Sequence, residues 1–203
     1  MEGRLVSEDT VALAQAGGTR DWESVTPWSF PDPVAPPVAA RRQGVKLALP
    51  ELTAAVQRLG RANKPVLVEG VGGLLCPLTE DATVADLIAA VGLRLVVVAR
   101  RSLGTLNHTL LTVDVARRRG LEVVGIVVNE TSPPAGLADA TNVDELRRLL
   151  PVPVLTVIPH QPIPRPGPLP ELAAVPWWRL CFTGHPPEEG AEAYPRLGAE
   201  RGA

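Results

Sequence analysis

The 203-residue sequence is long enough for one domain of ordinary size with a buried core. Hydrophobic residues make up 45% of the chain and charged residues 21%, which is typical of a globular protein. The net charge of −2 argues against a nucleic-acid partner, and no apolar run approaches the roughly 20 residues of a membrane-spanning helix. Two cysteines, Cys76 and Cys181, cannot build a disulfide framework, so we expect a cytoplasmic protein without a membrane partner.

The first 61 residues predict helices separated by a proline-rich loop. Residues 7–16 (SEDTVALAQA) predict a short helix with Ser7 as its N-cap. Residues 24–44 carry five prolines and predict a loop with a helical turn near residues 38–42. Residues 50–61 predict an amphipathic helix that begins at a proline.

Four apolar runs rich in valine, leucine and isoleucine predict strands of a parallel sheet that is buried on both faces. They lie at residues 66–68, 95–99, 123–128 and 154–158. The stretches between them predict helices, at residues 82–91, 105–119 and 141–150. This alternation predicts an α/β fold, a mostly parallel sheet flanked by helices with right-handed crossovers.

The end of the chain has a different composition. Twelve of the 22 prolines lie between Pro151 and Pro195. Because proline interrupts both helices and sheet ladders, we predict an irregular tail over residues 162–203 that follows an α/β domain over residues 1–161.

Polar residues and glycines follow the predicted strands, where ligands collect in open parallel sheets. Glu69 precedes a glycine cluster, so a carboxylate suited to Mg²⁺ stands beside backbone N–H groups that can approach an anion. A tight turn with a solvated Glu69 is the structural alternative. Gly104 opens a long helix whose N-terminus is suited to bind an anion. The structural alternative is an ordinary helix start.

Three segments together resemble the dethiobiotin synthetase family. Residues 68–78 (VEGVGGLLCPL) are similar to the family's VEGAGGxxxPL segment, and residues 103–112 (LGTLNHTLLT) to its LGxINHxxLT helix start. Residues 120–129 (GLEVVGIVVN) resemble its GLxxxGxVxN strand, and residues 7–13 and 29–40 match as well. The resemblance covers residues 2–161 in family order.

The resemblance implies a P-loop NTPase-like α/β fold and a homodimer. It implies ATP- and Mg²⁺-dependent closure of the ureido ring of dethiobiotin from 7,8-diaminononanoate and CO₂. One amine takes up CO₂ as a carbamate, ATP phosphorylates the carbamate, and the second amine displaces phosphate. Such chemistry depends on positioning and on stabilising the charge of a phosphoryl group.

The resemblance also assigns roles to residues that match the family's motifs. It implies that Asp9 and Glu69 are ligands of Mg²⁺ and ATP. The other ATP contacts that it implies are Gly70, Val71, Gly72, Asn129, Glu130, Pro159, His160 and Gln161. The substrate contacts that it implies, to a carboxylate across the dimer, are Leu103, Gly104 and Asn107.

Two motifs of the family have no counterpart in the sequence. These are the phosphate-binding loop GxxxxGK[ST] and the KPVxTG segment with the family's catalytic lysine, whereas Lys46 and Lys64 are the only lysines here. No catalytic residue is therefore predicted within the chain, and the family's first strands are expected to be missing. We interpret this as a start assigned too far downstream. The alternatives are a non-catalytic dimeric homologue and another ATP-dependent amidoligase, against which the LGxxNHxxLT match argues.

Overall fold

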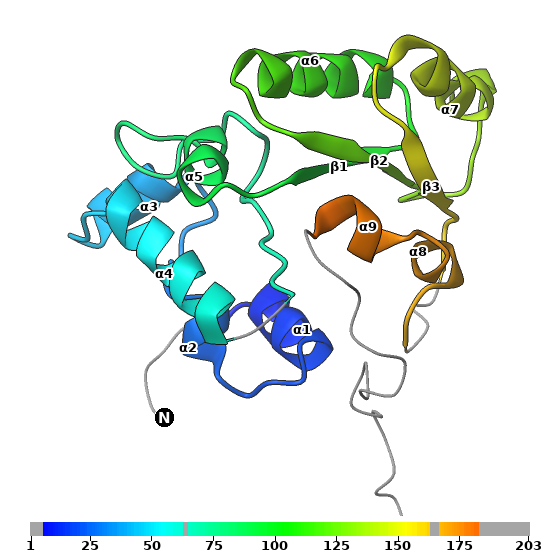
Figure 1. The fold of residues 1–203 in the computed structure, drawn as a ribbon. Helices are drawn as coiled ribbons and strands as arrows, with labels where there is room; N and C mark the ends of the chain where they lie inside the picture. Colours follow the sequence, from blue (N-terminus) through cyan, green and yellow to red (C-terminus); the bar gives the residue numbers. More distant parts are fainter. Residues whose placement is uncertain (1–5, 63–64, 163–166, 183–203) are drawn as a thin grey trace, which may run out of the picture. The chain divides into compact units, whose positions relative to one another are not determined.

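The computed structural model describes residues 6–62, 65–162 and 167–182. The described chain falls into two units, one that ends at Val91 and one that begins at Gly92. Figure 1 labels the helices and strands of both units. No helix within the described ranges is long and apolar enough to span a membrane.

The described part of the first unit is built of helices. They are α1 (Glu8–Ala16), α2 (Trp22–Val25), α3 (Pro36–Arg42), α4 (Leu49–Ala62) and α5 (Val84–Val91). The predicted N-cap is confirmed, since the Ser7 Oγ accepts the backbone N–H of Thr10 at 3.1 Å. The helical turn predicted near residues 38–42 is part of α3, and the helices predicted at 50–61 and 82–91 are α4 and α5. Among these five helices of the first unit, α2 alone was not predicted.

The strand predicted at residues 66–68 is wrong. Residues 66–70 form no regular element, and the side chains of Leu67 and Val68 are 93% and 38% exposed. A strand exists only as part of a hydrogen-bonded ladder, and this run has no ladder partner among the described residues. The apolar run therefore lies in an extended segment that leads into the glycine loop.

The second unit is a three-stranded parallel sheet with helices on both faces. Its strands, β1 (Leu95–Arg100), β2 (Val123–Asn129) and β3 (Val154–Ile158), are hydrogen-bonded in the order β1-β2-β3. Figure 1 shows α6 (Thr105–Arg118) and α7 (Leu137–Leu149) over one face. The opposite face carries α8 (Pro170–Ala173) and α9 (Trp177–Cys181). The predicted α/β class is thus confirmed, with three strands in the described chain rather than four.

The core of this unit lies between the sheet and the helices α6 and α7. Ile126, Val128 and Leu146 are 0% exposed, and burying each such side chain contributes about 1.5–3 kcal/mol. The further buried members of the core are Ala99, Val113, Val143 and Leu150. Because β2 is hydrogen-bonded to β1 on one side and to β3 on the other, the residues at its carboxyl end lie between two neighbouring strand ends.

Two short helices lie in the region predicted to be irregular. Pro170 occupies the first turn of α8, where a missing N–H costs nothing, so this proline begins a helix instead of breaking one. The indole N–H of Trp177 donates to the carbonyl of Leu172 at 2.7 Å, and Arg94 Nη1 donates to the carbonyl of Leu180 at 2.8 Å. Residues 163–166 and 183–203 of the predicted tail lie outside the described residues, and the domain boundary at 161 stays a prediction.

Candidate functional site

The carboxyl ends of the three strands bring five of the ten predicted nucleotide contacts together. Arg100 pairs with Asn129 in the ladder, and Asn129 pairs with Ile158. Because the strands are parallel, the residues that follow them meet at one edge of the sheet. Asn129 and Glu130 leave β2 there, and Pro159, His160 and Gln161 follow β3 at the same edge.

A buried carboxylate links all three strand ends. The Glu130 side chain is 8% exposed, and its Oε1 forms an ion pair with Nη1 of Arg101. Its Oε2 accepts the backbone N–H of His160 at 3.1 Å. Backbone bonds reinforce this arrangement, because the Glu130 N–H donates to the carbonyl of Ile158 at 2.9 Å. Both carboxylate oxygens are thus already engaged within the protein.

The loop between β1 and α6 is tied to α7 by two polar contacts. Arg101 Nε donates to the carbonyl of Asp139 at 2.6 Å, and the buried Asn142 donates from Nδ2 to the carbonyl of Ser102 at 3.0 Å. Gly104, at φ +92°, then opens α6 in a conformation that favours glycine. The loop therefore presents the first turn of α6 in a fixed position.

The predicted substrate contacts lie on the exposed side of this helix start. Leu103 is 87% exposed, and Gly104 and Asn107 are exposed as well. No side chain caps the helix at Gly104, and the Thr105 N–H donates to the carbonyl of Ser102 at 3.1 Å, so an anion would meet the next N–H groups and the positive dipole end. The arrangement fits recognition of a carboxylate.

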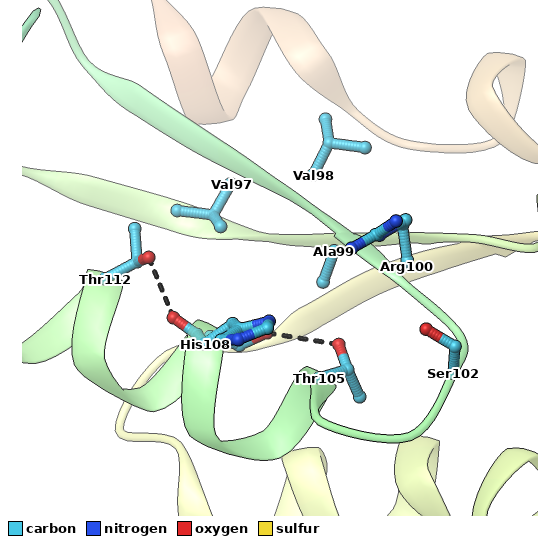
Figure 2. Close-up of a pocket in the computed structure, with 9 residues that line it drawn as sticks. Val97, Val98, Ala99, Arg100, Ser102, Thr105, His108 and Thr112 are labelled. Atoms are coloured by element: carbon cyan, nitrogen blue, oxygen red, sulfur yellow. Dashed lines mark hydrogen bonds between the residues drawn. The ribbon is translucent and has the colours of Figure 1, made fainter. Parts of the chain in front are cut away.

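A pocket of about 140 Å³ lies between β1 and α6. Figure 2 shows that Val97 and Ala99 point toward α6, whereas Val98 points to the other side of the sheet. Three threonines of α6, Thr105, Thr109 and Thr112, also line the pocket. The sequence analysis missed this pocket, although threonines at positions i, i+4 and i+7 share one face of a helix and were the available signal.

The glycine loop belongs to the first unit. Glu69, Gly70, Val71 and Gly72 are all exposed. Gly72 has φ +71°, and a Cβ on Gly70 would lie 3.2 Å from Cγ1 of Val84, so both positions favour glycine. The loop is closed behind these residues, where the Cys76 N–H donates to the carbonyl of Gly73 at 2.9 Å. Its exposed backbone is suited to approach by an anion.

The two predicted magnesium ligands are also in the first unit. Asp9 lies in the exposed first turn of α1, and Glu69 precedes the glycine loop. Their carboxylates are oxygen donors of the kind that Mg²⁺ prefers, and each is exposed to solvent and accessible to an ion. Within the described residues no group of three or more His, Cys, Asp or Glu side chains is placed to hold a metal.

Comparison with known proteins supports the resemblance. A family profile described as an AAA domain matches residues 2–166. The chain is 44% identical over 155 residues to the ATP-dependent dethiobiotin synthetase BioD of Anaeromyxobacter dehalogenans strain 2CP-C, which is 76% of this chain and 70% of that protein. It is 42% identical over 163 residues to the protein of the same name from Bacillus licheniformis, covering 78% of this chain and 69% of the relative.

A third relative with that name, from Corynebacterium efficiens, is 43% identical over 131 residues, or 64% of this chain and 60% of the relative. The matched segment contains the strand ends of the second unit and the glycine loop of the first. These findings confirm the predicted P-loop-type α/β class and the prediction of an enzyme of the ligase class. The chain belongs to the dethiobiotin synthetase family.

Proposed function

We propose that this chain binds ATP and 7,8-diaminononanoate for the closure of the ureido ring of dethiobiotin. The observation that carries the proposal is the sheet edge at which Asn129, Glu130 and His160 meet in one hydrogen-bonded cluster. A polar edge at the carboxyl ends of parallel strands is where such folds bind nucleotides. The names of the relatives supply ATP and dethiobiotin, the resemblance to the family supplies 7,8-diaminononanoate, and the strand-end geometry is compatible with nucleotide binding.

In this proposal the base of ATP lies against the sheet edge. The half-buried amide of Asn129 offers both a donor and an acceptor, which suits the edge of a purine. The turn of Pro159, His160 and Gln161 lies beside it and contributes its backbone. We assign the direct base contacts to Asn129 and to this turn.

The phosphates are assigned to the glycine loop of the first unit. The exposed backbone of Gly70, Val71 and Gly72 suits a close approach by phosphate oxygens. Asp9 and Glu69 would hold Mg²⁺, which when bound neutralises charge on the phosphates. The carboxylate of diaminononanoate is assigned to Leu103, Gly104 and Asn107 at the start of α6, in a homodimer where this turn serves the partner's site.

The reaction requires three steps. One amine of the substrate adds to CO₂ and loses a proton, which gives a carbamate. A carbamate oxygen attacks the γ-phosphorus of ATP and ADP leaves, after which the second amine attacks the carbonyl carbon and phosphate leaves. The residues assigned above bind and orient the reactants, and we place the reaction in the cytoplasm.

A second candidate function is binding without turnover. The printed sequence contains neither the lysine of a GxxxxGK[ST] loop nor that of a KPVxTG segment, and cationic contacts of this kind stabilise a transferring phosphoryl group by several kcal/mol. We therefore propose that residues 1–203 support ligand binding, and that turnover by this chain alone is not expected.

The test is calorimetric titration of the purified chain with ATP and Mg²⁺, alongside an assay of dethiobiotin formation. We expect MgATP binding that weakens in Asn129→Ala and Glu69→Gln, with no change in the control Glu51→Gln, whose exposed carboxylate lies in α4 of the same unit as Glu69. Binding that is identical in all four proteins would remove these residues from the site. Formation of dethiobiotin by the purified chain would reject the non-catalytic candidate.

A further inference from the structure

The resemblance to the family treats Glu130 as a nucleotide contact, but its surroundings indicate another role. Its side chain is 8% exposed, and each of its two oxygens already has a partner inside the protein, Arg101 for one and the His160 N–H for the other. A nucleotide base would have to compete with these partners for a buried group. Neighbouring Asn129 is more accessible, and its side-chain amide offers both an N–H donor and a carbonyl acceptor.

The Glu130 carboxylate contacts the loops that follow two other strands, so it joins three loops. Glu130 itself follows β2, its ion-pair partner Arg101 follows β1, and its backbone partner His160 follows β3. A buried carboxylate is tolerated only with an opposite charge and hydrogen bonds, so loss of either partner disturbs the whole cluster. The strand ends are therefore joined through one charge as well as through the sheet ladder.

Arg101 extends this link to the start of α6. Its Nε donates to the carbonyl of Asp139 at 2.6 Å, while its Nη1 faces Glu130. Three residues further along the chain, Gly104 opens the helix whose first turn is assigned to the substrate carboxylate. A lysine has a single charged nitrogen and cannot reproduce both contacts in the same fixed geometry.

We propose that Glu130 is a positioning residue rather than a nucleotide ligand, and that its ion pair with Arg101 couples the base-binding turn to the loop before α6. The assignment rests on the nucleotide site proposed above. In this role the pair orders Asn129 and the Pro159–Gln161 turn before ATP arrives. Removing either charge disorders all three loops, including those that the mutated residue does not belong to.

The test compares Glu130→Gln, Arg101→Met and the double variant with the intact chain. Arg101→Lys serves as a milder variant, and Arg118→Met, which removes an exposed ion pair with Asp114, serves as the control. We expect both single variants to raise the Kd of MgATP roughly tenfold, and the double variant to be no weaker than the worse single one, because the two residues act as a unit. The Kd of Mg-tripolyphosphate, which has no base, stays within about twofold.

Amide hydrogen exchange of the nucleotide-free proteins supplies an independent readout. In both single variants we expect faster exchange in all three loops, at residues 101–104, 129–131 and 158–161, and no change in Arg118→Met. Faster exchange confined to the mutated loop would overturn the coupling. Weaker ATP binding in Glu130→Gln alone, with Arg101→Met unaffected, would make Glu130 a direct ligand. Failure of the intact chain to bind MgATP would reject the proposed function, while the exchange data still decide this proposal.

Discussion

A single added methyl group at Gly125 tests how tightly β2 and β3 pack. Gly125 lies in β2, and a Cβ built on it would stand 2.7 Å from Cγ of Leu155 and 2.7 Å from the carbonyl oxygen of Pro153. Ordinary contacts of this kind are about 3.5–4.0 Å long. Gly125→Ala therefore requires a side chain and a backbone segment to move.

The magnitude follows from what has to move. The carbonyl of Pro153 accepts the backbone N–H of Ile126 at 2.9 Å, so a shift of this carbonyl weakens a bond that joins β2 to β3. Overpacking of a core costs about 1–3 kcal/mol, and a weakened hydrogen bond adds about 0.5–1.5 kcal/mol. We expect Gly125→Ala to lower the free energy of unfolding by about 2–4 kcal/mol.

Urea denaturation followed by circular dichroism measures this change. With an m-value of about 2 kcal/mol/M, the midpoint falls by roughly 1–2 M urea. Gly60→Ala is the matched control, because Gly60 lies in helix α4 with nothing within 4 Å of its Cβ position. There the same substitution stabilises by about 0.5–1 kcal/mol. An unchanged midpoint in Gly125→Ala would refute the packing described here for β2 and β3.

Three further substitutions or measurements probe other parts of the chain. Leu146→Ala removes a fully buried side chain and is expected to cost about 2–5 kcal/mol in urea denaturation, whereas Leu149→Ala, 40% exposed in the same helix, costs clearly less. Ser7→Ala removes the N-cap of α1 and is expected to cost about 0.5–2 kcal/mol by the same assay, and no change would contradict the capping bond. Burial raises the pKa of the Cys181 thiol, so in a Cys76→Ser background its alkylation rate should rise with pH at a higher midpoint in the folded chain than in urea; equal midpoints would contradict this. Because folding favours the protonated thiol, this group's contribution to stability is present below the unfolded thiol pKa and is lost as the pH rises through the folded one.

Elements specified by neighbouring residues were predicted well. The helix that begins after Ser7 and the helix that begins after Gly104 carry their start signals within one turn, and both lie where the sequence indicates. The strands β1, β2 and β3 were predicted because continuous β-branched runs indicate burial on both faces. The helix predicted at residues 141–150 begins earlier, at Leu137, where the Asp139 carboxylate accepts the Ala135 N–H at 2.9 Å.

Features that depend on distant residues were not predicted. The run at residues 66–68 has strand-like composition, but a strand also needs a partner, and composition does not supply one. The ion pair of Arg101 with Glu130 joins residues 29 positions apart, and an arginine after one strand gives no sign of which carboxylate it will meet. Helix α8 was not predicted because Pro170 belongs to a proline-rich run, which is typical of irregular structure, although proline is well accommodated in the first turn of a helix.

The proposed base contacts of the second unit and the proposed phosphate contacts of the first unit are each held within their own unit by different means. Asn129 lies at the end of the central strand and is fixed on both sides by ladder partners, and the buried carboxylate of Glu130 adds a link to the following turn. The glycine loop at residues 69–72 is exposed and belongs to no ladder, and the residues behind it are tied to α5, where the Ala85 N–H donates to the carbonyl of Leu74 at 3.0 Å. Ordering a loop on binding costs conformational free energy, whereas the residues of a preformed sheet edge lose their conformational freedom when the chain folds. In the proposed function, recognition of the base therefore uses a preformed sheet edge, whereas recognition of the phosphates uses an exposed loop.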